Sequence, residues 1–161
     1  MIRLAKLSDA AAVADIYNYY IKETVITFEV EPVSAEQMRE RIAKVLERKR
    51  WFVFEEDGIV VGYAYAGQWR ERAAYKETVE TSVYLDKNVT GKGIGTKLMS
   101  FLMGTLKKQG VHVIMAGMSI PNEPSAALHE KLGFKKVAHF EEVGNKFGRW
   151  IDVGSWQYIV E

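Results

Sequence analysis

The segment around residues 83–96 constrains the fold of this chain more than any other part of the sequence. It begins with the strand-like run Val83-Tyr84-Leu85, and Gly91-Lys92-Gly93-Ile94-Gly95-Thr96 opens a helix that extends to about Lys108. Glycine allows a backbone to take positive φ and to approach a ligand closely. Free N–H groups at a helix start, together with the helix dipole, form an anion site. The segment therefore predicts a strand–turn–helix unit that cradles a pyrophosphate.

Three phosphate-binding patterns can be compared with this turn. The dinucleotide fingerprint G-x-G-x-x-G fits Gly91 and Gly93 but finds Thr96 in its third position. The P-loop pattern does not fit, because no glycine pair has its spacing before a Gly-Lys. The pyrophosphate loop of the GNAT superfamily of acetyltransferases, [Q/R]-x-x-G-x-[G/A], fits Gly93 and Gly95, with Thr90 where Gln or Arg is usual. A plain glycine-rich turn before a helix is the structural alternative.

A second motif follows the next predicted strand. The run from Asn122 to Phe134, with Ser125, Leu128 and His129 between them, resembles the second GNAT signature N-x-x-S-x-x-L-[YH]-x-x-x-G-F. Two such motifs in the same order make coincidence much less credible than either motif alone.

A closer resemblance extends over nearly the whole chain. It is carried by Tyr20-Ile21, Thr27-Phe28, Trp69 to Tyr75, Thr78 to Tyr84, Leu128-His129-Glu130 and Gly148 to Gln157. These segments are similar to the phosphinothricin N-acetyltransferase family. The resemblance implies the GNAT fold, acetyl-CoA as donor, a small amino-acid-like acceptor and a homodimer.

The order of predicted helices and strands along the chain predicts one α/β (α+β) domain, residues 1–161, with a mixed central β-sheet flanked by helices. Apolar residues recur at helical spacing after Ser8, and Ser34 with Gln37 matches a capping box before a second helix. Asp57-Gly58 indicates a hairpin turn between two strands. The predicted strands are 1–5, 51–55, 59–66, 78–85, 111–118, 136–142 and 150–160, and a short helix covers 124–132.

Composition narrows the function classes. The net charge of +1 gives no sign of bulk binding to nucleic acid or to an anionic membrane, and no run of 18 apolar residues is present. The absence of cysteine excludes disulfides, thiolate metal sites and a cysteine nucleophile, and is consistent with a cytoplasmic protein. We expect no metal and no membrane or nucleic-acid partner.

Attack on a thioester needs a neutral amine, and a carboxylate can take the proton directly or through a water. Glu80 lies in a predicted strand just before the glycine-rich turn, at the position where the family places its base; a surface carboxylate paired with a lysine is the alternative. The resemblance implies an oxyanion donor in the same strand, at Val83 or a neighbour. It places His129 where an acid would protonate the leaving thiolate, although a packed helix histidine is equally consistent.

Further site residues come from the same resemblance. The donor site comprises Val83, Tyr84, Leu85, the 91–96 turn, and Asn122 with Ser125, which contact the pantetheine arm or simply cap a helix. For the acceptor we assign Glu80, Arg72 to its carboxylate, and Tyr75 and Phe28 to the pocket wall. Residues 144–147 are expected to form a loop over this pocket.

The sequence therefore predicts an enzyme that moves acetyl from acetyl-CoA to the α-amine of phosphinothricin, methionine sulfoximine or methionine sulfone. Two alternatives stay open. One is acetylation of a protein N-terminus or lysine, and the other is a non-catalytic module that binds acyl-CoA.

Overall fold

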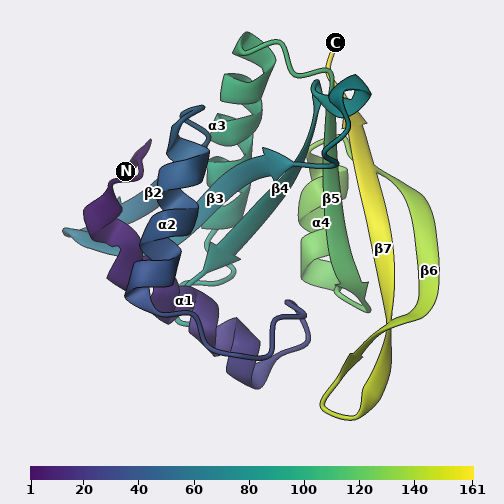
Figure 1. The fold of residues 1–161 in the computed structure, drawn as a ribbon, viewed down its shortest axis with the longest axis horizontal. Helices are drawn as coiled ribbons and strands as arrows, with labels where there is room; N and C mark the ends of the chain where they lie inside the picture. The colour runs from purple at the N-terminus through teal and green to yellow at the C-terminus, as the bar shows by residue number, and fades with distance from the viewer.

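Seven strands form one sheet in the computed structural model, which describes residues 1–161 (Figure 1). The order across the sheet is β1-β2-β3-β4-β5-β7-β6. The strands are β1 (Ile2–Leu4), β2 (Trp51–Glu56), β3 (Ile59–Gln68), β4 (Thr78–Leu85), β5 (Val113–Ile120), β6 (Lys135–Lys146) and β7 (Arg149–Ile159). The helices are α1 (Ala10–Glu23), α2 (Ala35–Leu46), α3 (Ile94–Lys108) and α4 (Glu123–Lys131), with short 3₁₀ turns at Leu7–Asp9 and Ala73–Tyr75. The predicted fold class is confirmed.

The junction between β4 and β5 is the only parallel pairing in the sheet. It is short, because only Thr78–Glu80 pair with Val113–Met115. Beyond Glu80, β4 continues along β3 alone, and β5 continues along β7 alone. The two strands therefore diverge into a V that opens toward the end of β4, as Figure 1 shows.

Each face of the sheet carries its own apolar core. On one face, α3 buries Leu98, Leu102 and Leu106 completely against β2–β5, and Leu128 of α4 packs beside them. On the other face, α1 and α2 bury Ile21 and Ile42 against Trp51, Val53 and Tyr63. Burial of one such side chain is worth roughly 1.5–3 kcal/mol, so both layers hold the strands that border the V.

Local signals in the sequence are realised at the expected places. Ser34 Oγ accepts from the Gln37 amide at 3.1 Å, and Gln37 Oε1 accepts from the Ser34 amide at 2.9 Å, which completes the capping box. Asp57 and Gly58 both have positive φ, 50° and 79°, as a two-residue hairpin turn of type I′ requires.

Some predicted strand boundaries are wrong: β5 begins and ends two residues later than predicted, β3 ends two residues later, and the largest error is at the end of β6. The strand expected to end near residue 142 continues to Lys146, because β6 keeps pairing with β7 as far as Lys146 opposite Arg149. Irregular register between Phe140 and Gly144 absorbs extra residues there. Residues 144–146 are therefore strand, and only Phe147 and Gly148 form the turn.

Candidate active site

The turn before α3 presents a row of free amides. Gly91 and Gly93 have φ of 80° and 77°, and Gly93 caps α3 without any side-chain hydrogen bond. The amides from Gly91 to Thr96 donate to no protein acceptor, and the first amide of this region to do so is that of Lys97, to Gly93 O at 3.1 Å. A Cβ built at either glycine would meet nothing within 4 Å. The turn therefore has both the donors and the space that a diphosphate needs.

Gly95 has a different role from the two glycines before it. A Cβ at this position would lie 3.0 Å from Leu128 Cδ1 and 3.7 Å from Leu85 Cδ1. The missing side chain therefore lets the start of α3 lie directly against β4 and α4.

An open depression of about 620 Å³ borders the same turn. It is lined by Gly93, Thr96, Lys97, Ser100, Phe101 and Lys131. Lys97 and Lys131 add positive charge beside the free amides, which suits a ligand with several phosphates. The sequence motifs do not include Lys97, although its place in the first turn of the helix is a usable signal.

Glu80 lies where β4 and β5 part. It pairs with Gly67 of β3 and Met115 of β5, and a Cβ built on Gly117 would be 3.8 Å from Glu80 Oε2. Glycine on both neighbouring strands leaves the space around the carboxylate open. Glu80 forms no ion pair, so the surface pairing with a lysine is not realised. Its tip reaches solvent, yet partial burial raises its pKa above the ordinary value of 4.5, which suits a base.

The rest of β4 forms one arm of the V. Successive side chains alternate between the faces, so Val83 and Leu85 pack toward α3, whereas Tyr84 packs toward α1. The backbone edge of this stretch that faces β5 has no strand partner. The amides of an antiparallel strand point alternately to its two edges. Some of the amides of residues 81–85 therefore point into the V. Such amides are where the predicted oxyanion donor would lie.

Helix α4 holds the second motif. Asn122 Oδ1 accepts from the Ser125 amide at 3.3 Å, so its capping role is realised. His129 is buried, with Nδ1 2.7 Å from the Ser125 carbonyl oxygen and its ring edge-on to Phe134. Burial lowers the pKa of His129, an effect that its hydrogen bond to Ser125 opposes. The imidazole is therefore neutral near pH 7, and none of these contacts joins it to Glu80.

The residues assigned to the acceptor fall into two groups. In the loop before β4, Arg70 stacks on Trp69, with its guanidinium 4.2 Å from the ring centroid, and Tyr75 meets Trp69 edge-on. Arg72 is exposed and forms no ion pair, so its guanidinium is free. Phe28 lies elsewhere, in the connection between α1 and α2, where its partly exposed ring rests on Gly144.

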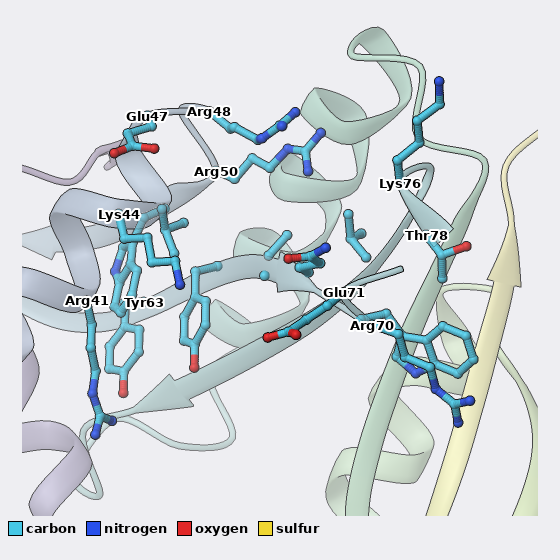
Figure 2. A pocket seen from close by; sticks show the side chains of 18 of the residues that line it. Arg41, Lys44, Glu47, Arg48, Arg50, Tyr63, Arg70, Glu71, Lys76 and Thr78 are labelled. Carbon is cyan, nitrogen blue, oxygen red and sulfur yellow. The ribbon is translucent and has the colours of Figure 1, made fainter. Parts of the chain in front are cut away.

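A cavity of about 650 Å³ lies on the α2 side of the sheet and extends to the loop before β4 (Figure 2). Basic side chains dominate the charged lining, which comprises Arg41, Lys44, Arg48, Arg50, Arg70 and Lys76 against Glu47 and Glu71. The cavity reaches Gly67, the strand partner of Glu80. None of the predicted site residues Glu80, Arg72, Tyr75, Phe28 and His129 lines it. The α2 cations were not predicted, because the polar face of an amphipathic helix gives no signal of a cavity.

Two further features bear on the chemistry. No group of three or more His, Asp or Glu side chains lies close enough together to hold a metal ion. No helix combines the length and apolarity that a membrane crossing requires.

Comparison with known proteins supports the geometry. The acetyltransferase (GNAT) domain model matches residues 2–154. The chain is 38% identical over 156 residues to phosphinothricin N-acetyltransferase of Streptomyces viridochromogenes, covering 97% of this chain and 85% of that protein. It is 39% identical to the L-methionine sulfoximine/L-methionine sulfone acetyltransferase of Salmonella typhimurium, covering 94% and 90%.

A solved structure agrees with the same assignment. The GNAT superfamily phosphinothricin acetyltransferase of Sinorhizobium meliloti, in complex with acetyl-CoA, superposes with a TM-score of 0.95 at 34% identity. The superposition covers 99% of this chain and 88% of that one. The sheet that diverges at Glu80, the open turn before α3 and these matches agree: the chain belongs to the GNAT acetyltransferase family.

Proposed function

We propose that this protein transfers acetyl from acetyl-CoA to the α-amine of a small amino-acid-like acceptor. The observation that carries the proposal is the position of Glu80. A carboxylate with a raised pKa and no ion pair lies at the base of the V, on the strand that ends in the free amides of the 91–96 turn. The candidate base therefore lies on the strand that leads into the anion cradle.

The donor would lie along the V. The amides of the turn, with Lys97 and Lys131 beside them, would hold the phosphates of the coenzyme. The pantetheine arm would then pass between α4, near Asn122 and Ser125, and the unpaired edge of β4. An amide near Val83 on that edge would donate to the thioester carbonyl as it becomes an oxyanion. This places the reacting carbon next to Glu80.

The acceptor would react from the α1–α2 side. Its amine, with a pKa near 7.7–8.0, is largely protonated at neutral pH. Glu80 takes the proton directly or through a water, the nitrogen lone pair forms the C–N bond, and the C–S bond breaks as the tetrahedral intermediate collapses. The nitrogen then loses its second proton to form the neutral amide, and the thiolate takes up one proton, so that coenzyme A leaves as the thiol. An acid role for His129 stays a prediction; a neutral imidazole bonded to Ser125 O favours a positioning role in α4.

The acceptor class follows from charge. Arg72, unpaired in the loop before β4, suits a carboxylate through a bidentate contact, and the basic cavity beside Gly67 suits further acidic or polar oxygens. Tyr75 and Phe28 lie outside that cavity and would contact the acceptor from the loop before β4 and from the α1–α2 connection. Phosphinothricin, methionine sulfoximine and methionine sulfone combine an α-amino acid with such oxygens. The relatives described above are named as acetyltransferases of these compounds.

The test is release of the coenzyme A thiol with a panel of these three amino acids, common amino acids and one peptide. Because the protein has no cysteine, it contributes no thiol to the signal of this assay. We expect release with at least one of the three. Release with the peptide alone would favour protein acetylation, and tight coenzyme binding without any release would favour a non-catalytic module.

We further propose that two copies associate through the β6–β7 hairpin. Large apolar side chains there are about half exposed or more, with Trp150 at 67%, Val143 at 61% and Phe147 at 58%. Exposed apolar groups gathered on one hairpin are typical of a contact surface, and β6 is also an edge strand with an unpaired side. Light scattering after size exclusion should give twice 18.3 kDa. The need for acetyl-CoA, an intracellular thioester, favours the cytoplasm.

A further inference from the structure

The open end of the V is bridged on its α1 side by a buried lysine. Lys146, the last residue of β6, is only 3% exposed. Its Nζ donates to Thr27 O at 2.8 Å and lies 3.4 Å from Tyr20 O. Both carbonyls belong to α1 or to the connection that follows it, residues 24–34, which we name the α1–α2 loop. A buried ammonium is stable only with such partners, so the contact fixes the loop against the hairpin.

Gly144 makes a second contact between the same two segments. A Cβ built on Gly144 would lie 2.4 Å from Phe28 Cε2 and 2.5 Å from Phe28 Cζ. The ring of Phe28 therefore lies directly on the glycine backbone, two residues before Lys146. Only glycine allows this approach without displacing the ring.

These contacts join the two arms of the V. On the β4 side, the Thr27 hydroxyl is 2.8 Å from Tyr17 Oη, and the Tyr17 ring meets that of Tyr84 at a centroid distance of 5.1 Å. On the β5 side, β6 pairs with β7, and β7 pairs with β5 along its whole length. Between β4 and β5 themselves, the ladder at Thr78–Glu80 is only three residues long, and the Thr81 hydroxyl adds one hydrogen bond, to Met115 O at 3.4 Å.

We infer that Lys146 is a positioning residue, which fixes the width of the open end of the V and holds Phe28 in the acceptor pocket. The statement that Phe28 borders an acceptor rests on the proposed function, whereas the contacts of Lys146 do not depend on it. Lys146 touches neither substrate in this scheme, and it acts through Thr27 and Phe28. Its removal should therefore weaken acceptor binding more than coenzyme binding, because the phosphate cradle lies at the start of α3.

Two variants test this inference independently. Lys146→Met removes both hydrogen bonds, and Gly144→Ala displaces Phe28 while keeping the lysine. We expect Lys146→Met to raise the acceptor KM roughly 10- to 100-fold, the factor that corresponds to losing a hydrogen bond to a charged group. Gly144→Ala should raise the same KM, because it displaces the ring of Phe28. The KM for acetyl-CoA should change by less than about threefold, as expected when only one substrate's contacts are altered. Lys135→Met, at an exposed position of the same strand, is the matched control and should leave both KM values unchanged.

A readout without substrates separates the bridge from the proposed function. Amide hydrogen exchange in residues 24–31 should become faster in Lys146→Met, while exchange in α3 stays unchanged. The double variant Lys146→Met/Phe28→Ala should show less than the sum of the two single effects on acceptor KM, because both act through one ring. Equal rises in both KM values, or unchanged exchange at 24–31, would overturn the inference. Absence of turnover by the unmodified protein would instead refute the proposed function, and the exchange result would still decide whether the bridge exists.

Discussion

Replacing Glu80 by Gln removes the one carboxylate of β4 and keeps the size of the side chain. Loss of a general base typically lowers the rate by about 10²–10⁴. The size of this loss of rate should depend on pH. Without a base, the variant depends on amine that is already deprotonated, and for a pKa near 7.8 that fraction rises roughly 60-fold between pH 6 and pH 9. The deficit of Glu80→Gln should therefore be largest below pH 7 and should narrow as the pH rises.

The same substitution should lower the rate without lowering the stability of the protein at neutral pH. Burial raises the pKa of Glu80, so the folded state disfavours the ionised form. The stability that this group contributes is thus fully present below pH 4.5 and is lost as the pH rises through its raised folded pKa. No ion pair is broken by the substitution. At pH 7 and above, Glu80→Gln should unfold at the same temperature as the unmodified protein or at a higher one.

The assay combines thiol release with thermal unfolding and coenzyme titration. Coenzyme affinity should stay unchanged, because the phosphates would be held at the 91–96 turn. Glu77→Gln, at an exposed position just before β4, provides a carboxylate control that lines neither described cavity. If Glu80→Gln keeps kcat within about threefold of the unmodified enzyme at pH 7, with the same pH profile, then Glu80 is not the base.

Three further substitutions test the other parts of the site. Gly93→Ala forces a φ of 77° on a residue with a Cβ, at a cost of about 1–2 kcal/mol, and should weaken coenzyme binding in calorimetry without changing the acceptor KM. Arg72→Gln should raise the acceptor KM roughly 10- to 100-fold, with Arg39→Gln on α2 as a control; an unchanged KM would remove Arg72 from the pocket. Because burial lowers the pKa of His129, its stabilising contribution is lost as the pH falls below 6.5, so His129→Gln should reduce the acid sensitivity of the melting temperature.

Most helices, strands and turns of the fold can be predicted from local sequence signals. The capping box at Ser34, the turn at Asp57-Gly58 and the glycine-rich entry to α3 depend on residues within a few positions of one another. Such features follow from backbone geometry alone and appear where the sequence predicts them. The strand with Glu80 was also predicted within its observed limits, because its apolar alternation is strong.

Features that depend on register between distant segments were not predictable. Gly67 and Gly117 flank Glu80 only because β3 and β5 pair with β4 in one particular register, which no local pattern determines. Lys146 was expected in a loop because Gly-Asn-Lys-Phe is polar and glycine-containing. Pairing with β7 made it strand, and packing against Thr27 buried it. Tertiary contacts thus overrode the local composition.

The connectivity of the sheet explains why the proposed donor site and the proposed base lie on consecutive elements. Parallel strands cannot be joined by a tight turn and need a crossover, here α3, between β4 and β5. The crossover begins where β4 ends, so its free amides lie at the far end of the strand that carries Glu80. Glu80 and Leu85 are five residue steps apart, roughly 17 Å at 3.3 Å per residue, which is the scale of an extended pantetheine arm. One parallel junction would therefore set both the proposed location of the phosphates and their distance from the proposed base, whereas the proposed acceptor side has no such covalent link and would depend on the contacts of Lys146 and Gly144.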